Sequence, residues 1–247
     1  MSEHHGHEPN TGCGRRIGLL IPSPNTVAET EFWRLAPAGL SVHSSRMPFF
    51  AERDAEPLET MASAVPRVLD EACTAEPDVI AYACTASSAR PQPDRYQAHL
   101  SELAARPVFT AACALLDALR HWQATRIALL TPYPQAVNDK EKAFFAANGV
   151  QVMVDRSIIV DPAQQRLRHM CKVPPAVLLE QARDVVRTHA VDAIVLSCCD
   201  MRTLEVIAAI ESATGKLVTS SNQALYWRTL QALALPPRAM NAGSLLA

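Results

Sequence analysis

The stretch RIGLLIPSPN at residues 16–25 returns as RIALLTPYPQ at residues 126–135. Each copy is an apolar run followed by a loop with two prolines, as expected for a strand that is covered on both faces and ends in a turn. A second pair of similar stretches, DVIAYACTAS at 78–87 and DAIVLSCCDM at 192–201, follows with nearly the same offset. The sequence therefore predicts a duplication, with two similar lobes in one chain.

Short apolar runs alternate with longer helical patterns along both halves of the chain. The predicted strands are 16–21, 40–47, 78–83, 106–110, 126–131, 150–156, 192–197 and 216–220. The predicted helices are 26–36, 58–74, 92–104, 111–122, 136–148, 175–189, 202–214 and 222–234. Strict alternation is typical of parallel sheets with helices on both faces. We predict an α/β fold of two pseudo-symmetric, doubly wound lobes with parallel sheets and an active-site cleft between them.

The two lobes have expected limits of 15–122 and 123–247. Residues 1–14 are polar and are expected to form a disordered N-terminal tail. The last helix of such a chain often packs back across the molecule. We therefore expect the C-terminal helix, placed at 222–240, to contact the first lobe.

The chain has 247 residues, of which 49% are hydrophobic, and a formal net charge of −2. This apolar content can build a sizeable core, whereas the charge gives no basic surface for a nucleic acid. No apolar run approaches the ~18–20 residues of a membrane span, and the N-terminus lacks the apolar centre of a signal peptide. We expect a cytoplasmic protein with no nucleic-acid partner and no membrane partner.

The chain contains 7 cysteines, an odd number, and none of them forms a C-x-x-C pair. Disulfide frameworks are rare in the cytoplasm, and thiolate zinc sites usually show paired short spacings. The histidines of the N-terminal tail are expected to bind metal only incidentally. We therefore expect neither a metal nor a cofactor. Packing or incidental exposure is the expected role of Cys13, Cys73, Cys113 and Cys171.

The loops after the first and third strands of each lobe are the places to look for chemistry, because open α/β sheets bind ligands at the carboxyl ends of their strands. Cys84 and Cys198 follow equivalent strands, so two thiols are expected to flank one cleft. The helix expected after Cys84 begins with Thr85 and Ala86. Its free N–H groups would lower the pKa of the thiol and would also hold a carboxylate.

Asn25 and Tyr133 lie in the equivalent loops PSPNT and TPYPQ and are expected to donate hydrogen bonds to the same anion. Thr26 is a candidate cap for the helix that follows. Simpler interpretations remain open. A cysteine at a strand end is often only a small buried residue, and Asn25 and Tyr133 could be turn residues.

Four stretches resemble the aspartate/glutamate racemase superfamily, in particular its branch of maleate cis–trans isomerases and arylmalonate decarboxylases. They are IGLLIPSPNTVAETEF, AYACTASS, TPYPQAVN and LSCCDMRTLEVI. The resemblance implies a cofactor-free site between the lobes and a homodimer or higher oligomer. It implies that Cys84 and Cys198 are catalytic, because CCDM aligns with a C-x-x-M pattern. The substrate-binding residues that it implies are Ser23, Asn25, Thr85, Ala86, Tyr133 and Cys199.

The leading hypothesis is a cofactor-independent cis–trans isomerase of a small unsaturated dicarboxylate, converting maleate to fumarate. Cys84 is the expected nucleophile, and Cys198 is expected to protect or protonate the intermediate. The alternatives are a two-cysteine racemase or epimerase, a malonate-type decarboxylase, and a non-catalytic protein that binds small acids. Two positions depart from the branch: Pro24 replaces a serine and Pro162 an asparagine. Because proline has no side-chain donor, we expect one carboxylate contact to be missing.

Overall fold

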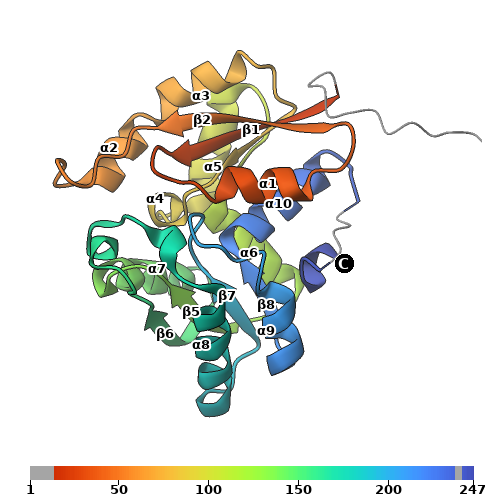
Figure 1. Ribbon diagram of the computed structural model, residues 1–247. Helices are drawn as coiled ribbons and strands as arrows, with labels where there is room; N and C mark the ends of the chain where they lie inside the picture. The colour runs from red at the N-terminus through yellow and green to blue at the C-terminus, as the bar shows by residue number, and fades with distance from the viewer. Residues whose placement is uncertain (1–13, 237–240) are drawn as a thin grey trace, which may run out of the picture.

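The computed structural model describes residues 14–236 and 241–247, so almost all of the predicted N-terminal tail lies outside the described residues. Two four-stranded parallel sheets form the frame, with the strand orders β2-β1-β3-β4 and β6-β5-β7-β8 (Figure 1). The identical order in the two halves confirms the predicted α/β fold of two similar lobes. The strands are β1 Arg15–Pro22, β2 Leu40–Met47, β3 Val79–Tyr82, β4 Val108–Thr110, β5 Arg126–Thr131, β6 Gln151–Ser157, β7 Ala193–Leu196 and β8 Leu217–Ser220.

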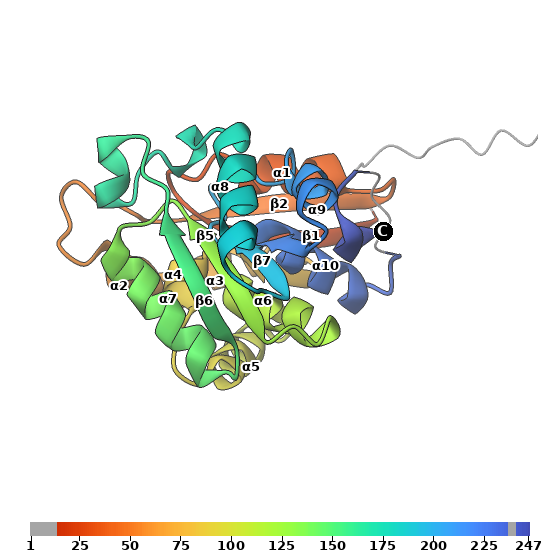
Figure 2. The ribbon, with the colours of Figure 1, turned by 90° about the horizontal axis from the view of Figure 1, so that it is seen from below.

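Helices cover both faces of each sheet (Figure 2). The α-helices are α1 Ala28–Leu35, α2 Pro57–Ser63, α3 Val65–Cys73, α4 Thr85–Ser88, α5 Pro93–Ala104, α6 Ala111–His121, α7 Gln135–Ala147, α8 Pro175–Thr188, α9 Ile207–Thr214 and α10 Ser221–Ala232. Three short 3₁₀ helices are η1 Pro162–Arg166, η2 Met170–Lys172 and η3 Ser244–Leu246. No helix among the described residues is long and apolar enough to cross a membrane.

The inner strands β1, β3, β5 and β7 are mostly apolar because both of their faces are buried, whereas the edge strands β2 and β6 carry polar side chains. Side chains of a strand alternate between its two faces, so Ile17 and Leu19 of β1 face a core that the two lobes share, whereas Leu20 faces a separate core of the first lobe. In β5, Ile127 faces the shared core and Leu130 faces the core of the second lobe. The shared core fixes the two sheets relative to each other.

Helices α6 and α10 pack against each other between the two sheets (Figure 1). Although α10 comes late in the chain, it contacts β3, β4 and α1 of the first half. The hydroxyl group of Tyr226 donates a hydrogen bond to the carbonyl oxygen of Leu35 at 2.8 Å, and its ring meets Phe32 edge-on at 5.2 Å. The residue limits of the two lobes, 15–122 and 123–247, remain a prediction.

Three predicted helices differ from the observed ones. The run 58–74 is two helices, because Pro66 lacks the N–H that a continuous helix needs at that position. Helix α10 ends at Ala232 instead of residue 240, before Pro236 and the proline after it. Helix α9 begins at Ile207 instead of residue 202, because two preceding N–H groups donate to a carboxylate of the first lobe.

Candidate active site

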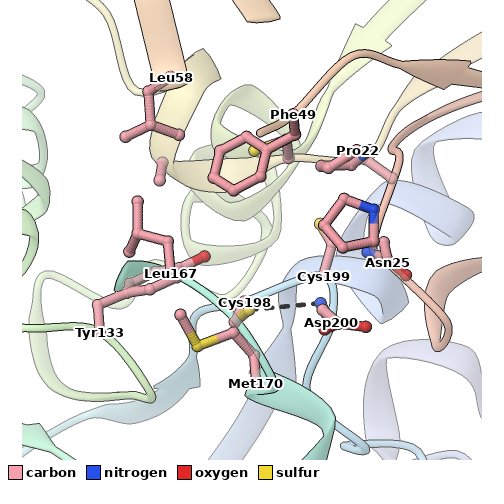
Figure 3. Close-up of a pocket in the computed structure, with 14 residues that line it drawn as sticks. Pro22, Asn25, Phe49, Leu58, Tyr133, Leu167, Met170, Cys198, Cys199 and Asp200 are labelled. Carbon is pink, nitrogen blue, oxygen red and sulfur yellow. Dashed lines mark hydrogen bonds between the residues drawn. The ribbon is translucent and has the colours of Figure 1, made fainter. Parts of the chain in front are cut away.

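A pocket between the lobes lies at the carboxyl ends of β1, β3, β5 and β7 (Figure 3). In the order β2-β1-β3-β4, the strand that follows β1 in the sequence lies on one side of it and β3 lies on the other. The gap between β1 and β3 is therefore a topological switch point, which is the usual ligand site of an open α/β sheet. Cys84 and Cys198 each stand two residues beyond the last residue of an equivalent strand, β3 and β7. The two thiol residues therefore reach the same pocket from opposite lobes.

The pocket has a polar part and an apolar part. Among the described residues that line it, none is lysine or arginine. The lining residues with polar or thiol groups are Asn25, Cys84, Tyr133, Cys198, Cys199 and Asp200. The large apolar residues are Pro22, Pro24, Phe49, Leu58, Leu167 and Met170. An anion bound here would be held by hydrogen bonds and not by a positively charged side chain.

Cys84 is the N-cap residue of α4, so it lies directly before the first turn of that helix. The N–H groups of Ala86 and Ser87 and the hydroxyl of Ser87 favour its thiolate, and Ser87 is itself bonded to the hydroxyl of Tyr82 at 2.7 Å. Burial nevertheless raises the pKa of the Cys84 thiol. The expected net lowering of this pKa was wrong, because loss of hydration outweighs the helix N–H groups.

Cys198 has a different environment. Burial, followed by the carboxylate of Asp200, raises the pKa of its thiol well above the usual range. The N–H of Asp200 donates to Sγ of Cys198 at 3.3 Å, and the Tyr133 hydroxyl also favours the thiolate. Cys84 has a carboxyl neighbour too, Glu141, but burial raises the pKa of that group to about 8, so Asp200 is the neighbour that carries a charge at neutral pH. The two thiols are equivalent in topology but not in electrostatics.

Tyr133 is buried, and its hydroxyl is influenced by both Cys84 and Cys198. Burial raises its pKa well above the usual range, so the hydroxyl stays protonated and can donate. The Asn25 side-chain oxygen accepts hydrogen bonds from the N–H groups of Val27 and Ala28 at 2.9 and 3.0 Å. The N-cap residue of α1 is Val27, so the predicted cap by Thr26 was wrong; the bonds to Val27 and Ala28 orient the Asn25 amide, which lines the pocket.

Of the other four predicted binding residues, Ala86 and Cys199 line the pocket, while Ser23 and Thr85 are not among its lining residues. The Ser23 hydroxyl exchanges hydrogen bonds with the main chain of Phe49 at 3.1 and 3.2 Å. The Thr85 hydroxyl donates to Ser221 of α10 at 2.7 Å and lies 3.8 Å from Sγ of Cys199. Their observed contacts therefore support the walls of the pocket.

Pro162 is the first residue of η1, after Asp161, whose carboxylate accepts from the N–H of Ala163 at 2.8 Å. Pro162 does not line the pocket; this segment contributes Leu167 and Met170 instead. Pro24 does line it. Of the two departures from the family pattern, only Pro24 therefore changes the lining of the pocket directly.

Two carboxylates near the site were not among the residues predicted from the sequence. Glu31 of α1 is buried and accepts hydrogen bonds from the loop that follows Cys198. Asp200 lines the pocket and accepts from the N–H of Thr26 at 2.8 Å. Both lie inside quoted motifs, ETEF and CCDM, so their positions were visible in the sequence. What the sequence did not show is that α1 and the second cysteine loop meet.

A third buried carboxyl group, Glu141 of α7, has no hydrogen-bond partner for either oxygen among the described residues. Burial raises its pKa to about 8, and the nearby Ser197 hydroxyl opposes that rise less strongly. Glu141 is therefore protonated at neutral pH. Its charge, when it forms, acts on both Cys84 and Tyr133. Within residues 14–236 and 241–247, no three histidine, cysteine or acidic side chains group as metal ligands.

Comparison with known proteins decides the family. The model of the arylmalonate decarboxylase family matches residues 91–246, which is more than half of the chain. The chain belongs to this family. Among family relatives, the maleate isomerase of Nocardia farcinica is 31% identical over 245 residues, covering 94% of this chain and 95% of its own length.

Two solved structures extend the comparison. The Nocardia farcinica maleate cis–trans isomerase, as a cysteine-to-serine variant with a covalently bound succinylcysteine intermediate, has a TM-score of 0.82 at 31% identity and covers 94% of this chain and 98% of its own. The maleate isomerase of Pseudomonas putida S16 with maleate has a TM-score of 0.80 at 28% identity and covers 94% and 97%. Both agree with the two-lobed fold of this member of the arylmalonate decarboxylase family.

Proposed function

We propose that this protein is a cofactor-independent cis–trans isomerase that converts maleate to fumarate, with Cys84 as nucleophile and Cys198 as the second catalytic thiol. The observation that carries the proposal is the pair of thiols, supplied by equivalent strands of the two lobes to one pocket. The relatives named maleate isomerase support the reaction, and the succinylcysteine in one of them supports a cysteine adduct.

The reaction begins with Cys84 as a thiolate. Its Sγ forms a bond to one alkene carbon, and the π electron pair moves to the other carbon and its carboxylate. The developing charge is held by hydrogen bonds from Tyr133, Asn25 and the N–H groups of α4. The former double bond is now single and rotates. The same electron pair then re-forms the π bond, the C–S bond breaks, and the trans product leaves.

The different surroundings of the two thiols support this division of roles. Cys84 faces N–H groups that stabilise a thiolate, whereas Cys198 faces the Asp200 carboxylate, which opposes ionisation. Cys198 is therefore suited to remain a neutral thiol. In that form it can protonate the carbanion of the adduct, which gives a succinyl group on Cys84, and can take the same proton back before elimination.

The test is direct. Purified protein is incubated with maleate, and the vinyl protons of maleate and fumarate are followed by proton NMR. We expect fumarate to accumulate without an added metal or nucleotide. A folded protein that leaves maleate unchanged at every pH between 5 and 9 would exclude the proposed reaction on this substrate.

A second candidate is decarboxylation of a malonate that carries an apolar group. The apolar part of the pocket, with Phe49, Leu58, Leu167 and Met170, favours it because it offers a surface for an aryl substituent. Release of carbon dioxide from phenylmalonate, measured beside maleate isomerisation, distinguishes the two reactions. The second cysteine alone is needed to protonate the product of a decarboxylation. Retained decarboxylase activity in Cys84→Ser would therefore favour this candidate.

We also propose a cellular compartment and an oligomeric state for this protein. The six cysteines among the described residues are free thiols, which fits a reducing compartment such as the cytoplasm. We infer a homodimer or higher homo-oligomer from the family resemblance. Light scattering on the purified protein measures the assembly.

A further inference from the structure

Asp200 places a carboxyl group inside the pocket that is proposed to bind a dicarboxylate. No lysine or arginine lines the described part of this pocket, and its other polar groups are three thiols, a phenol and an amide. Two like charges that share a poorly hydrated site repel each other strongly. The charge on Asp200 must therefore affect which ligands the pocket accepts.

The Asp200 side chain is fixed in this position. The N–H of Thr26, from the first lobe, donates to its Oδ1 at 2.8 Å, and the N–H groups of Val27 and Cys171 also favour its carboxylate. Its own N–H is bonded to Sγ of Cys198 (Figure 3). The bond to Thr26 holds the carboxyl group toward the first lobe, at the edge of the pocket that it lines.

Burial raises the pKa of Asp200 to about 6, against the opposing effect of the three N–H groups and of His169. The carboxyl group is thus mostly neutral below pH 6 and mostly ionised above it. Cys198 responds to the same charge, since ionised Asp200 raises the pKa of its thiol. Among the described residues, the titratable groups that interact with Asp200 are His169 and Cys171 on one side and Cys198 on the other, and Cys199 lines the same pocket.

We propose that Asp200 selects the charge of the substrate. As a neutral carboxyl group it donates a hydrogen bond to the second carboxylate of a dicarboxylate. As a carboxylate it repels that group and favours a cis-unsaturated acid with one negative charge, whose other end is a neutral group with an N–H donor. This inference rests on the proposed isomerase function, because it concerns the substrate class of the same site.

A purely structural role, in which Asp200 only anchors Thr26, makes a different prediction. Loss of the anchor would weaken the turnover of every substrate by a similar factor. Selection by charge changes the ratio between two substrates of the same shape. Asp200→Asn separates the two roles, since asparagine keeps an oxygen for the Thr26 N–H and removes only the charge.

The experiment compares maleate with the monoamide of maleic acid, which replaces one carboxylate oxygen by an NH₂ group. Isomerisation of both is measured at pH 8 for the wild type, Asp200→Asn and Glu29→Gln. Glu29 is a partly exposed residue of α1 that pairs with Arg46 and does not line the pocket, so its variant removes a carboxylate charge outside the pocket.

At pH 8 we expect the wild type to prefer the monoamide in kcat/KM. Asp200→Asn should lower the KM for maleate by about tenfold or more and reverse the preference. Glu29→Gln should behave as the wild type does. Lowering the pH to 5.5 should lower the KM of the wild type for maleate by a larger factor than it lowers the KM of Asp200→Asn. The comparison between the two proteins is required because maleate itself titrates in this range.

The decisive quantity is the kcat/KM for the monoamide divided by the kcat/KM for maleate. If this ratio at pH 8 is the same in the wild type and in Asp200→Asn, the proposal is overturned. Binding gives a second measurement that does not need turnover. Succinate and its monoamide cannot isomerise, and calorimetry gives their dissociation constants for the same three proteins. If no alkene is isomerised but succinate binds more tightly to Asp200→Asn, the reaction is wrong and the charge selection stands. Equal succinate affinities in all three proteins would contradict the selection.

Discussion

Oε1 of Glu31, in the first lobe, lies 2.9 Å from the main-chain nitrogen of Leu204, in the second. The same oxygen accepts from the N–H of Thr203 at 3.0 Å, while Oε2 accepts from the side-chain amide of Asn222 at 2.8 Å. Because Thr203 and Leu204 belong to the loop that starts with Cys198, this buried carboxyl group fixes one pocket thiol relative to the lobe that carries the other.

Replacing Glu31 by alanine should therefore destabilise the protein and also reduce its activity. Each buried N–H left without an acceptor costs about 1–3 kcal/mol, and both Thr203 and Leu204 would lose theirs. Urea unfolding measures the change. Glu29→Ala, a substitution on the same helix at a partly exposed ion pair, is the control and should change stability by less than about 1 kcal/mol. Equal stabilities of the two variants would show that the interlobe bonds contribute nothing.

Cys84→Ser should abolish isomerisation, with a fall in kcat of about a thousandfold or more, because a hydroxyl group is a much weaker nucleophile than a thiolate. Cys73→Ser is the matched control. Cys73 lies on α3 away from the pocket, and its Sγ contacts the carbonyl oxygen of Ala104, which a serine can also do. We expect Cys73→Ser to keep wild-type activity. Substantial turnover by folded Cys84→Ser would rule out Cys84 as the nucleophile.

Alkylation of the pocket thiols should be slow at neutral pH. Burial raises the pKa of Cys84, and that of Cys198 still further, so the reactive thiolate is a minor form near pH 7. The rate of iodoacetamide labelling should therefore keep rising above pH 9, with Cys84 ahead of Cys198. Peptide mass spectrometry measures both sites. Succinate in the pocket should protect them but should not protect Cys73, and a rate at Cys84 that is already at its plateau at pH 7 would contradict the raised pKa.

Glu141→Gln should make the protein more stable in mildly alkaline solution. The pKa of Glu141 is about 8 in the folded protein against a usual value of 4.5. Between these values the folded state holds a proton that the unfolded state has lost, so stability falls as the pH rises. Glutamine is neutral throughout and removes that fall, by an amount on the order of 1–4 kcal/mol at pH 8. Thermal unfolding at pH 5 and pH 8 measures it; the two proteins should converge at pH 5.

The α/β fold was predictable because its signal is local and repeated. After their first arginine, runs such as RIGLLI and RIALLT are almost entirely apolar, which fits strands buried on both faces. The positions of all eight predicted strands agree with the observed ones to within a few residues. The errors arose where distant segments meet. Residues 202–206 have the composition of a helix, but their N–H groups donate to Glu31 of the other lobe.

The candidate site was partly predictable for the same reason. Duplicated strand ends indicated that Cys84 and Cys198 share one cleft, with Asn25 and Tyr133, and all four line the observed pocket. The apolar part of the pocket was not predictable, because Phe49, Leu58, Leu167 and Met170 lie in loops and short helices without a periodic pattern.

By itself, the sequence determined the two similar lobes, the parallel direction of their strands and the equivalence of the two cysteine loops, because strand pattern and duplication can be seen along the chain. Only the tertiary structure decided how the two thiols differ. Their pKa values depend on burial and on groups brought close by folding: the N–H groups of α4 at Cys84, and the Asp200 carboxylate at Cys198. Electrostatic interaction depends on distance in space and on hydration, and neither is encoded at a single position of the sequence.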